Sequence, residues 1–319
     1  MLEKPKTAKL STDPYKGVRD FYPEDMAVEN HIFSVWKCVA EKFGYQEYAA
    51  SILEPAELYR SKGSDEIVNE QMFTFTDRGG REVALRPEMT PSLARMVAAR
   101  RKSLKFPLRW FTIANCFRYE RPQRGRKREH WQLNCDVMGI AGIEAEVEII
   151  SLAHAIMKKF GAIDEDFVIK IGSRNALTNE LVKRKITKLE THREVARLLD
   201  KKGKMPEGER IEALEKLGAN LTISESDDIR EIRKVLAGKG VSNVIFDPEV
   251  VRGFDYYTGM VFEVFDTHAE NRRSLFGGGR YDNLLEIFGA EPVPTVGFGM
   301  GDVTIRDFLE THKLPLKPL

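Results

Sequence analysis

The chain has 319 residues and carries 50 lysines and arginines against 49 aspartates and glutamates, so its formal net charge is +1. This balance excludes a chain that is basic throughout, as nucleic-acid coat proteins are, and an acidic disordered tail. Hydrophobic residues make up 42% and charged residues 31%, which is typical of a globular protein. The length allows one large domain or two smaller ones, and we expect one large domain that carries an insert.

Cysteine usage and hydropathy predict a cytoplasmic protein. Cys38, Cys116 and Cys135 form no C-x-x-C pair, so the sequence indicates neither a disulfide framework nor a zinc site. Residues 1–14 are polar with no apolar stretch behind them, unlike a secretory signal. No run approaches the roughly 18 apolar residues that a membrane helix needs. We therefore expect a soluble chain with reduced thiols.

Two segments have the apolar spacing of amphipathic helices. Between 27 and 43, apolar residues recur at intervals of 4, 3, 4 and 4, and Gly44 then marks a C-terminal end. The same intervals recur between 145 and 160, before Gly161. Both segments are predicted to bury one helical face.

Strand patterns lie between and after these helices. Residues 72–76 and 81–85 are β-prone runs joined by Asp-Arg-Gly-Gly, which predicts a hairpin. Residues 109–120 and 131–138 predict two longer antiparallel strands around a basic connector, 121–130.

The character of the chain changes between 174 and 240, where Lys/Glu-rich helical patterns with few aromatics predict a helical insert. Strand patterns return at 244–246 and 256–265. A helix-like segment, 281–288, and a strand-to-helix segment, 296–309, follow. Because regular β-α-β alternation is missing, we expect an α+β fold with a mostly antiparallel sheet rather than a doubly wound parallel one.

Polar side chains share one face of the predicted strand 131–138. Because residues two apart point the same way, Gln132, Asn134 and Asp136 face one side and apolar residues the other. Arg118 and Glu120 share a face of the partner strand in the same way. A cation, carboxylates and an amide on one surface fit a polar ligand with phosphate and amine groups. A solvated outer face of the sheet is the alternative.

Cations are concentrated in the connector 121–130, although the whole chain is neutral. Guanidinium groups stay charged and bind phosphates in a bidentate way, so phosphates are their natural partners. An ordinary solvated basic loop is the alternative.

Farther along, Arg252 precedes the pair Tyr256 and Tyr257, which can form one side of a pocket for a flat polar ring. A core tyrosine pair beside a surface arginine explains that stretch equally.

Several catalytic patterns are excluded. The glycines of 297–301 lack the spacing and the β-α-β unit of a dinucleotide site, and those of 277–279 are not followed by Lys-Ser or Lys-Thr as in a P-loop. The six histidines lack metal-ligand spacing, and no G-x-S-x-G elbow exists. The glycine clusters are therefore predicted to permit close approach of backbone to a ligand or another strand.

Five stretches together resemble one family, the class II histidyl-tRNA synthetases, in the family's order and over nearly the whole chain. They are Gly17-Val18-Arg19-Asp20-Phe21, Leu85-Arg86-Pro87-Glu88-Met89-Thr90, Phe117 through Arg126, Arg252 through Gly259, and Gly278-Gly279-Arg280-Tyr281-Asp282. The second and fourth stretches are signatures of the histidine system rather than of class II in general.

The resemblance implies a class II aminoacyl-tRNA synthetase-like antiparallel sheet flanked by helices, with a small helical insertion domain. The catalytic core then comprises 1–173 and 241–319, and the insertion domain comprises 174–240. It also implies a homodimer that activates L-histidine with ATP and Mg²⁺ to histidyl-adenylate and pyrophosphate. Transfer of histidine to tRNA(His) in the cytoplasm would follow.

The resemblance further implies where histidine binds. Glu88 and Thr90 would hold the α-amino group, and Gln132 would lie near the amino-acid backbone. Asp136 and Tyr257 would bind the imidazole. The whole histidine-binding set implied in this way is Glu88, Met89, Thr90, Arg118, Gln132, Asp136, Arg252, Tyr256 and Tyr257.

The resemblance also implies ATP-binding and catalytic residues. Arg118 would hold the α-phosphate, Glu120 would lie near the adenine, and Arg126 would meet the outer phosphates. Arg252 resembles the family's catalytic arginine, which stabilises charge at the α-phosphate, and Arg118 is the second catalytic residue. No metal ligand is assigned.

The chain departs from the family pattern at four places. The imidazole-binding position is often Glu and is Asp136 here, and Ser51 stands where a proline is common in the first class motif. Val303-Thr304 stands where the family usually has Glu-Arg, so the adenine-stacking arginine is missing from its expected place. Arg306, two residues on, is turned by roughly 200° on a helix. Finally, we expect that the family's anticodon-binding domain is absent.

A non-catalytic regulatory subunit of ATP phosphoribosyltransferase, which senses histidine, is the alternative function. The short chain and the altered third motif favour it. The phosphate-binding set Arg118, Glu120, Arg126 and Arg252 favours the synthetase. A free-standing RNA-binding module is disfavoured because the chain as a whole is not basic.

Overall fold

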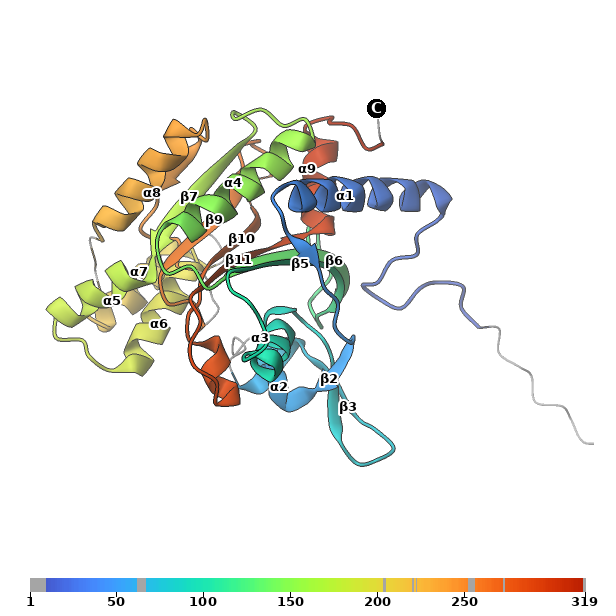
Figure 1. Cartoon of the computed structure of the whole chain (residues 1–319), viewed down its shortest axis with the longest axis horizontal. Helices are drawn as coiled ribbons and strands as arrows, with labels where there is room; N and C mark the ends of the chain where they lie inside the picture. The colour runs from blue at the N-terminus through green and yellow to red at the C-terminus, as the bar shows by residue number, and fades with distance from the viewer. Residues whose placement is uncertain are drawn as a thin grey trace, which may run out of the picture.

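One large sheet forms the centre of the molecule (Figure 1). The computed structural model describes residues 10–61, 67–202, 205–219, 221, 223–251, 256–271 and 273–317. Within these residues the sheet has eight strands, which in spatial order are β1 (Gln46–Glu47), β5 (Leu108–Phe117), β6 (Glu129–Met138), β11 (Thr295–Gly301), β10 (Ser274–Arg280), β9 (Met260–Asp266), β7 (Phe167–Ser173) and β8 (Val244–Phe246).

The sheet is antiparallel except at its two edges. β1 runs parallel to β5, and β8 runs parallel to β7, whereas the pairs between them are antiparallel. The α+β prediction is therefore confirmed. The β5–β6 ladder ends where Phe117 pairs with Glu129, so the first strand is shorter than predicted and the second begins earlier. β9 likewise begins later than the predicted 256.

Four helices cover one face of this sheet. They are α1 (Pro23–Lys42), α4 (Glu144–Lys159), α8 (Asp227–Gly238) and α9 (Asp302–Thr311). α1 and α4 confirm the helices predicted from apolar spacing, and Gly44 has the left-handed φ of +82° expected after a helix. Among the helices in the described residues, none is both long enough and apolar enough to span a bilayer.

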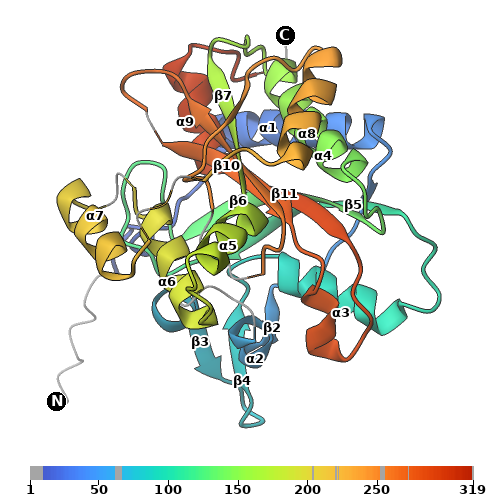
Figure 2. The same ribbon diagram turned by 90° about the vertical axis from the view of Figure 1, so that its left-hand side faces the viewer.

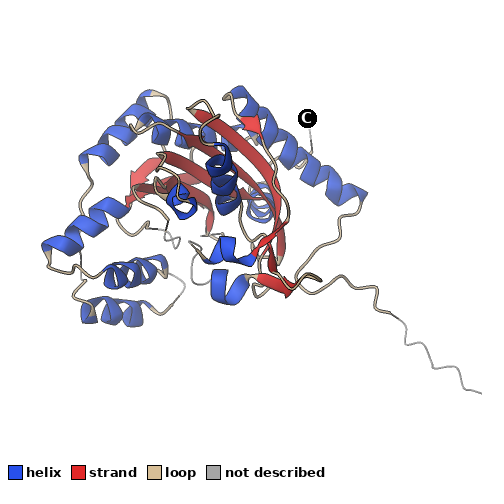
Figure 3. Cartoon of the chain, turned by 60° about the horizontal axis from the view of Figure 1, so that its bottom comes forward, coloured by secondary structure: helices blue, strands red, loops and turns tan. Residues whose placement is uncertain are grey.

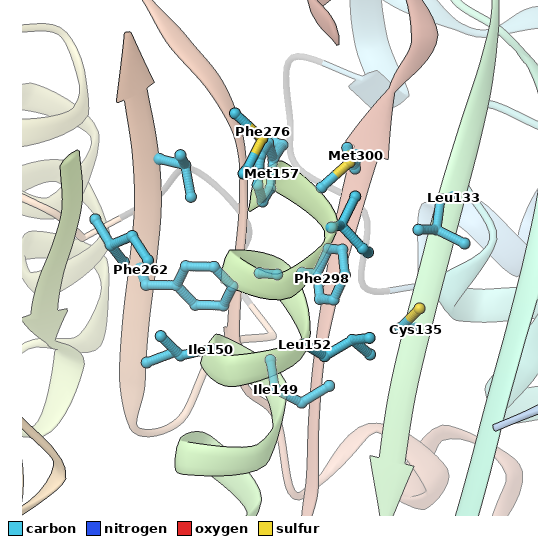
Figure 4. Close-up of a cluster of buried hydrophobic side chains, with 14 of the residues drawn as sticks. Leu133, Cys135, Ile149, Ile150, Leu152, Met157, Phe262, Phe276, Phe298 and Met300 are labelled. Carbon is cyan, nitrogen blue, oxygen red and sulfur yellow. The ribbon is translucent and has the colours of Figure 1, made fainter. Parts of the chain in front are cut away.

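The main core lies between α4 and the sheet (Figure 4). Ile149 and Leu152 of α4 face the strands, where the Phe262 and Phe298 rings meet edge to face with centroids 6.3 Å apart. Leu133 and its apolar neighbours on β6 join them, since alternate residues of that strand point to this side. The polar residues of β6 consequently point to the opposite face.

A smaller sheet and short helices lie below the large sheet in Figure 1. The smaller sheet has the order β2 (Leu53–Pro55), β4 (Glu82–Leu85) and β3 (Phe73–Thr76). β3 and β4 confirm the predicted hairpin. The helices of this region are α2 (Ala56–Arg60), a π-helix at Ile67–Gln71, α3 (Thr90–Arg100) and a 3₁₀ helix at Leu284–Phe288.

The predicted insert is helical, and its helices pack in two places. α5 (Arg174–Lys183), α6 (Leu189–Asp200) and α7 (Glu207–Lys216) share their own apolar cluster and stand apart from α1 and α4 (Figure 2). α8 instead buries Ile229, Ile232 and Leu236 in the main core. The boundaries of 174–240 stay a prediction, although α8, which lies within them, packs in the main core.

Candidate active site

A cavity of about 1410 Å³ opens on the face of the large sheet opposite α1 and α4. The strands form one curved layer with helices on both sides (Figure 3). The alternation of β6 decides which residues reach the cavity, because Leu133 and Cys135 are in the main core whereas Gln132, Asn134 and Asp136 line the cavity. The face considered as a solvated outer face in the alternative is thus the wall of a cavity.

Most of the predicted site residues meet at this cavity. Nine of them line it: Glu88, Thr90, Arg118, Glu120, Arg126, Gln132, Asp136, Tyr256 and Tyr257. Met89 does not, because its side chain is fully buried in an apolar cluster with Leu93 and Val97 of α3. Arg252 lies outside the described residues.

Glycines of β11 make room for the polar side chains of β6. Gly297 is the register partner of Asp136, and a Cβ at position 297 would lie 2.0 Å from Asp136 Oδ1. A Cβ at Gly299 would lie 2.5 Å from Gln132 Nε2. Glycine is required at 297, where a Cβ would also lie 2.9 Å from the Cys135 carbonyl oxygen, whereas at 299 the end of the Gln132 side chain would have to move.

Asp136 is a buried carboxylate with one oxygen in use and one free for a donor. Its side chain is only 2% exposed, and Oδ1 accepts a hydrogen bond from the Tyr281 hydroxyl. Oδ2 is buried and has no partner. Burial raises the pKa of Asp136 to about 7, and the Tyr281 hydrogen bond partly opposes this rise.

Glu88 repeats this arrangement at the start of α3. It is 2% exposed, Oε2 accepts from the Tyr256 hydroxyl at 3.2 Å, and Oε1 is buried without a partner. Burial raises the pKa of Glu88 to about 7, while the positive charge of Arg118 and the hydrogen bond from Tyr256 lower it in part. A buried acceptor of this kind is costly unless a ligand donor reaches it.

Three tyrosine rings connect the two carboxylates. The ring centroids of Tyr256 and Tyr281 are 5.5 Å apart, those of Tyr256 and Tyr257 are 4.9 Å apart, and those of Tyr257 and Tyr281 are 6.5 Å apart. These tilted and edge-on contacts form a wall with two hydroxyl groups directed at Asp136 and Glu88. The wall can therefore enclose a small ring that donates hydrogen bonds at its edge.

Arginines supply the positive charge of the cavity. Arg118 is half-buried, and its Nε donates to the Pro87 carbonyl at 3.0 Å, just before Glu88. Arg126 is exposed in the loop between β5 and β6, with Nη1 3.3 Å from Glu120 Oε2. A guanidinium group held by a neutral carbonyl keeps its charge for a ligand. Arg118 is thus suited to bind an anion next to the carboxylate pocket.

Sequence reasoning gave no ligand role to several lining residues, among them His130, Asn134 and Tyr281. Asn134 was placed on the polar face without a ligand role. His130 was assigned to the loop, but it lies in β6 and continues the two-residue period of Gln132. Burial and then the charges of Arg118 and Arg19 lower the pKa of His130 to about 3, so it presents a neutral ring.

The start of α9 carries Thr304 where the family usually has an arginine. Thr304 lines the cavity, whereas Arg306 does not. Arg306 instead bonds Glu310 Oε1 at 2.9 Å and Asp25 Oδ1 at 3.1 Å. Arg306 therefore does not supply a cation to this end of the cavity, as its position on the helix predicts.

The large antiparallel sheet has helices on one face and a polar cavity on the other. This is the fold of a class II aminoacyl-tRNA synthetase. A family model described as Histidyl-tRNA synthetase matches residues 17–207 and 203–303. The chain belongs to the histidyl-tRNA synthetase family.

Individual relatives agree with this membership. A histidine–tRNA ligase of Leptospira biflexa is 45% identical over 97% of this chain and 76% of its own length. The chloroplastic/mitochondrial histidine–tRNA ligase of Arabidopsis thaliana is 39% identical over 96% of this chain and 68% of its own length.

Solved structures share the fold. Histidyl-tRNA synthetase from Nostoc superposes with a TM-score of 0.78 at 21% identity, covering 97% of this chain and 79% of that one. A Bacillus halodurans protein, described as an ATP phosphoribosyltransferase regulatory subunit/histidyl-tRNA synthetase, superposes with a TM-score of 0.76 at 25% identity. It covers 95% of this chain and 84% of its own.

Proposed function

We propose that this chain activates L-histidine with ATP, releasing pyrophosphate, and transfers the histidyl group to tRNA(His). Membership of the family supports this function. The observation that carries it is the pair Asp136 and Glu88, two buried carboxylates on one cavity, each with one bonded oxygen and one oxygen without a partner. An amino acid with an ammonium group and an N–H-bearing ring supplies both missing donors.

Histidine would be held at both of its nitrogen-bearing ends. Glu88 Oε1 would accept from the α-ammonium group, with Thr90 beside it. Asp136 Oδ2 would accept from an imidazole N–H, while Tyr257 and Tyr281 enclose the ring. Asp136 is one methylene shorter than a glutamate, and the hydroxyl of Tyr281 fixes its orientation.

Adenylation requires positioning and charge neutralisation rather than a protein nucleophile. One oxygen of the histidine carboxylate bonds to the α-phosphorus of ATP, and the bond from that phosphorus to the bridging oxygen of pyrophosphate breaks. Arg118 would stabilise the charge on the α-phosphate oxygens, because it lies between the cavity and the Pro87 carbonyl. Arg252 stays a prediction for the same role.

The rest of the nucleotide would lie toward the loop between β5 and β6. We propose that Arg126 contacts the outer phosphates and that Glu120 lies near the adenine. Mg²⁺ would arrive with ATP, since this ion is usually bound by phosphates, water and one or two carboxylates. Glu263 is a cavity carboxylate that fits such an ion, whereas Glu120 is paired with Arg126.

In the second step, a hydroxyl of the terminal adenosine of tRNA(His) would attack the carbonyl carbon of the adenylate, and AMP would leave.

We also propose that the enzyme acts as a homodimer in the cytoplasm. Light scattering on the purified chain tests the dimer directly, and a monomeric mass would contradict it.

Histidine-dependent exchange of labelled pyrophosphate into ATP tests the activation step. We expect exchange with histidine and none with the other amino acids. Exchange that does not depend on histidine, or that another amino acid supports equally, would contradict the proposal.

The regulatory subunit is a second candidate function. The threonine at position 304 and the likeness to the Bacillus halodurans protein favour it. Absence of exchange together with histidine binding measured by calorimetry would support this candidate. Exchange would exclude it, because a non-catalytic sensor forms no adenylate.

A further inference from the structure

Arg273 reaches the end of the cavity at which the chain lacks the arginine expected at position 304. It lies directly before β10, lines the cavity with an exposed side chain, and donates a hydrogen bond from Nη1 to the Arg124 carbonyl oxygen. The point where Gly125 would carry a Cβ is 3.8 Å from Arg273 Nη1 and 3.9 Å from Thr304 Cγ2. The Arg273 guanidinium and the Thr304 side chain therefore flank the same glycine.

Arg273 differs from other arginines of this region in its partner, which is a backbone carbonyl. Other arginines of this region are paired, since Arg126 meets Glu120, and Arg306 bonds both Asp25 and Glu310. Across the described ranges of the chain, no ion pair within 4.0 Å involves Arg273. Like Arg118, it is held by a backbone carbonyl, which orients the guanidinium plane and leaves its charge for a ligand.

Small residues lie beside Arg273. The Thr304 hydroxyl is occupied with the carbonyl oxygens of Leu275 at 2.7 Å and Gly301 at 3.1 Å. Gly125 and Gly277 also line the cavity here without side chains. A flat ring can therefore lie close to the backbone, beside a planar cation.

We infer that Arg273 binds the adenine ring of ATP through its guanidinium face, in place of an arginine at position 304. The inference rests on the proposed function, which supplies ATP as the ligand. Guanidinium groups stack on aromatic rings, and a purine offers such a face. The cation would thus come from the β9–β10 connection rather than from α9.

Direct ATP binding by calorimetry tests this inference without requiring catalysis. We expect Arg273→Ala to weaken ATP binding about fivefold, the size of a cation–π contact of about 1 kcal/mol at an exposed site. Inorganic tripolyphosphate, which lacks the adenine, should bind the variant and the unaltered chain equally. Arg306→Ala is the matched control, because its guanidinium lies on the same helix as Thr304 but outside the cavity, and ATP binding should be unchanged.

Arg273→Gln separates ligand binding from support of the loop. Glutamine retains an N–H donor for the Arg124 carbonyl but has no cation, so we expect it to bind ATP as weakly as the alanine variant. ATP binding restored by glutamine would overturn the inference in favour of a structural role. Unchanged ATP binding in Arg273→Ala, or an equal loss for tripolyphosphate, would also overturn it.

The proposed function fails separately from this inference. If the unaltered chain binds ATP but performs no histidine-dependent exchange, the synthetase function is wrong. The effect of Arg273→Ala on ATP binding then still tests the role of Arg273. If the unaltered chain binds no ATP, both are wrong.

Discussion

The two ends of the cavity differ in how they hold charge. At the end where we propose that histidine binds, Asp136 and Glu88 are each 2% exposed and are oriented by tyrosine hydroxyls. At the end where we propose that the nucleotide binds, Arg126 is exposed and meets a carboxylate, and Arg273 is exposed and meets a backbone carbonyl. One end thus excludes water around a few acceptors, and the other offers several cations in contact with water.

This difference predicts how each end discriminates. A buried acceptor without a partner is costly, so the closed end favours a ligand with a donor at each required point and rejects one without it. Exposed cations are screened by water and salt, so each contributes less and the contributions are more nearly additive. Selectivity should therefore reside at the closed end, and nucleotide affinity should be spread over the open end.

Arg118 belongs to both ends, so its loss should have the largest effect. It lies beside Glu88, whose pKa its charge lowers, and it faces the cavity where the α-phosphate would bind. We expect Arg118→Ala to reduce histidine-dependent exchange by about 100-fold to 1,000-fold, because donors aimed at developing charge contribute on this scale. The fold should be retained, as circular dichroism can check.

Arg81→Ala is a suitable control for that variant. Arg81 is an exposed arginine paired with Asp77 in the β3–β4 hairpin, and it does not line the cavity. Its loss should leave exchange within about twofold, since surface ion pairs contribute little. Substantial exchange by Arg118→Ala would refute the assignment of Arg118 to the α-phosphate.

Asp136→Ala should affect histidine binding and leave ATP binding almost unchanged. Removing the carboxylate leaves the imidazole N–H without its acceptor, so we expect the KM for histidine to rise about 100-fold, in line with the cost of an unpaired buried group. The KM for ATP should change little. Equal losses for both substrates would contradict an imidazole-binding role for Asp136.

The sequence predicts those features of the site that depend on residues close together in the chain, and not those that depend on contacts between distant segments. Alternation along β6 places Gln132 and Asp136 on one face, and the structure agrees, because both depend on the local geometry of a strand. The contact of Gly297 with Asp136 depends on the register between β6 and β11. Nothing local in either strand specifies that register, so the reason for the glycine was not predictable.

Tertiary packing explains the other differences. The helical pattern of 227–238 predicts a helix correctly but cannot tell which apolar cluster it joins, and α8 joins the main core. Arg273 was overlooked because its approach to Thr304 is brought about by the β10–β11 pairing rather than by sequence spacing. Met89 lies within the motif stretch, yet the turn into α3 directs its side chain to the core.

Histidine affinity should rise with pH, because burial raises the pKa values of both Glu88 and Asp136 to about 7. Each carboxyl group binds its donor best when ionised. Between pH 6 and pH 8 the ionised fraction of such a group rises about tenfold, so the Kd for histidine should fall by about that factor for each group. Calorimetry at both pH values measures it.

In the unliganded protein, ionisation of the same two carboxyl groups lowers the free energy of unfolding as pH rises. A carboxyl whose folded pKa is raised binds more protons folded than unfolded between about pH 4 and 7, so the free energy of unfolding falls as pH rises through that range. The stabilisation by histidine should therefore be larger at pH 8 than at pH 6. Because free histidine titrates near pH 6.5, Asp136→Asn is the control that isolates the protein group.

Tyr281→Phe should give the smallest effect and tests whether the closed end depends on its tyrosine. The variant removes the donor to Asp136 Oδ1 and keeps the ring contact with Tyr256. Since that hydrogen bond lowers the pKa of Asp136, its loss should move the pH dependence of histidine binding upward. At pH 7 we expect affinity to fall about threefold to tenfold, the size of one typical hydrogen bond. An unshifted pH profile would mean that burial alone sets the properties of Asp136, and that the tyrosine serves only as a wall.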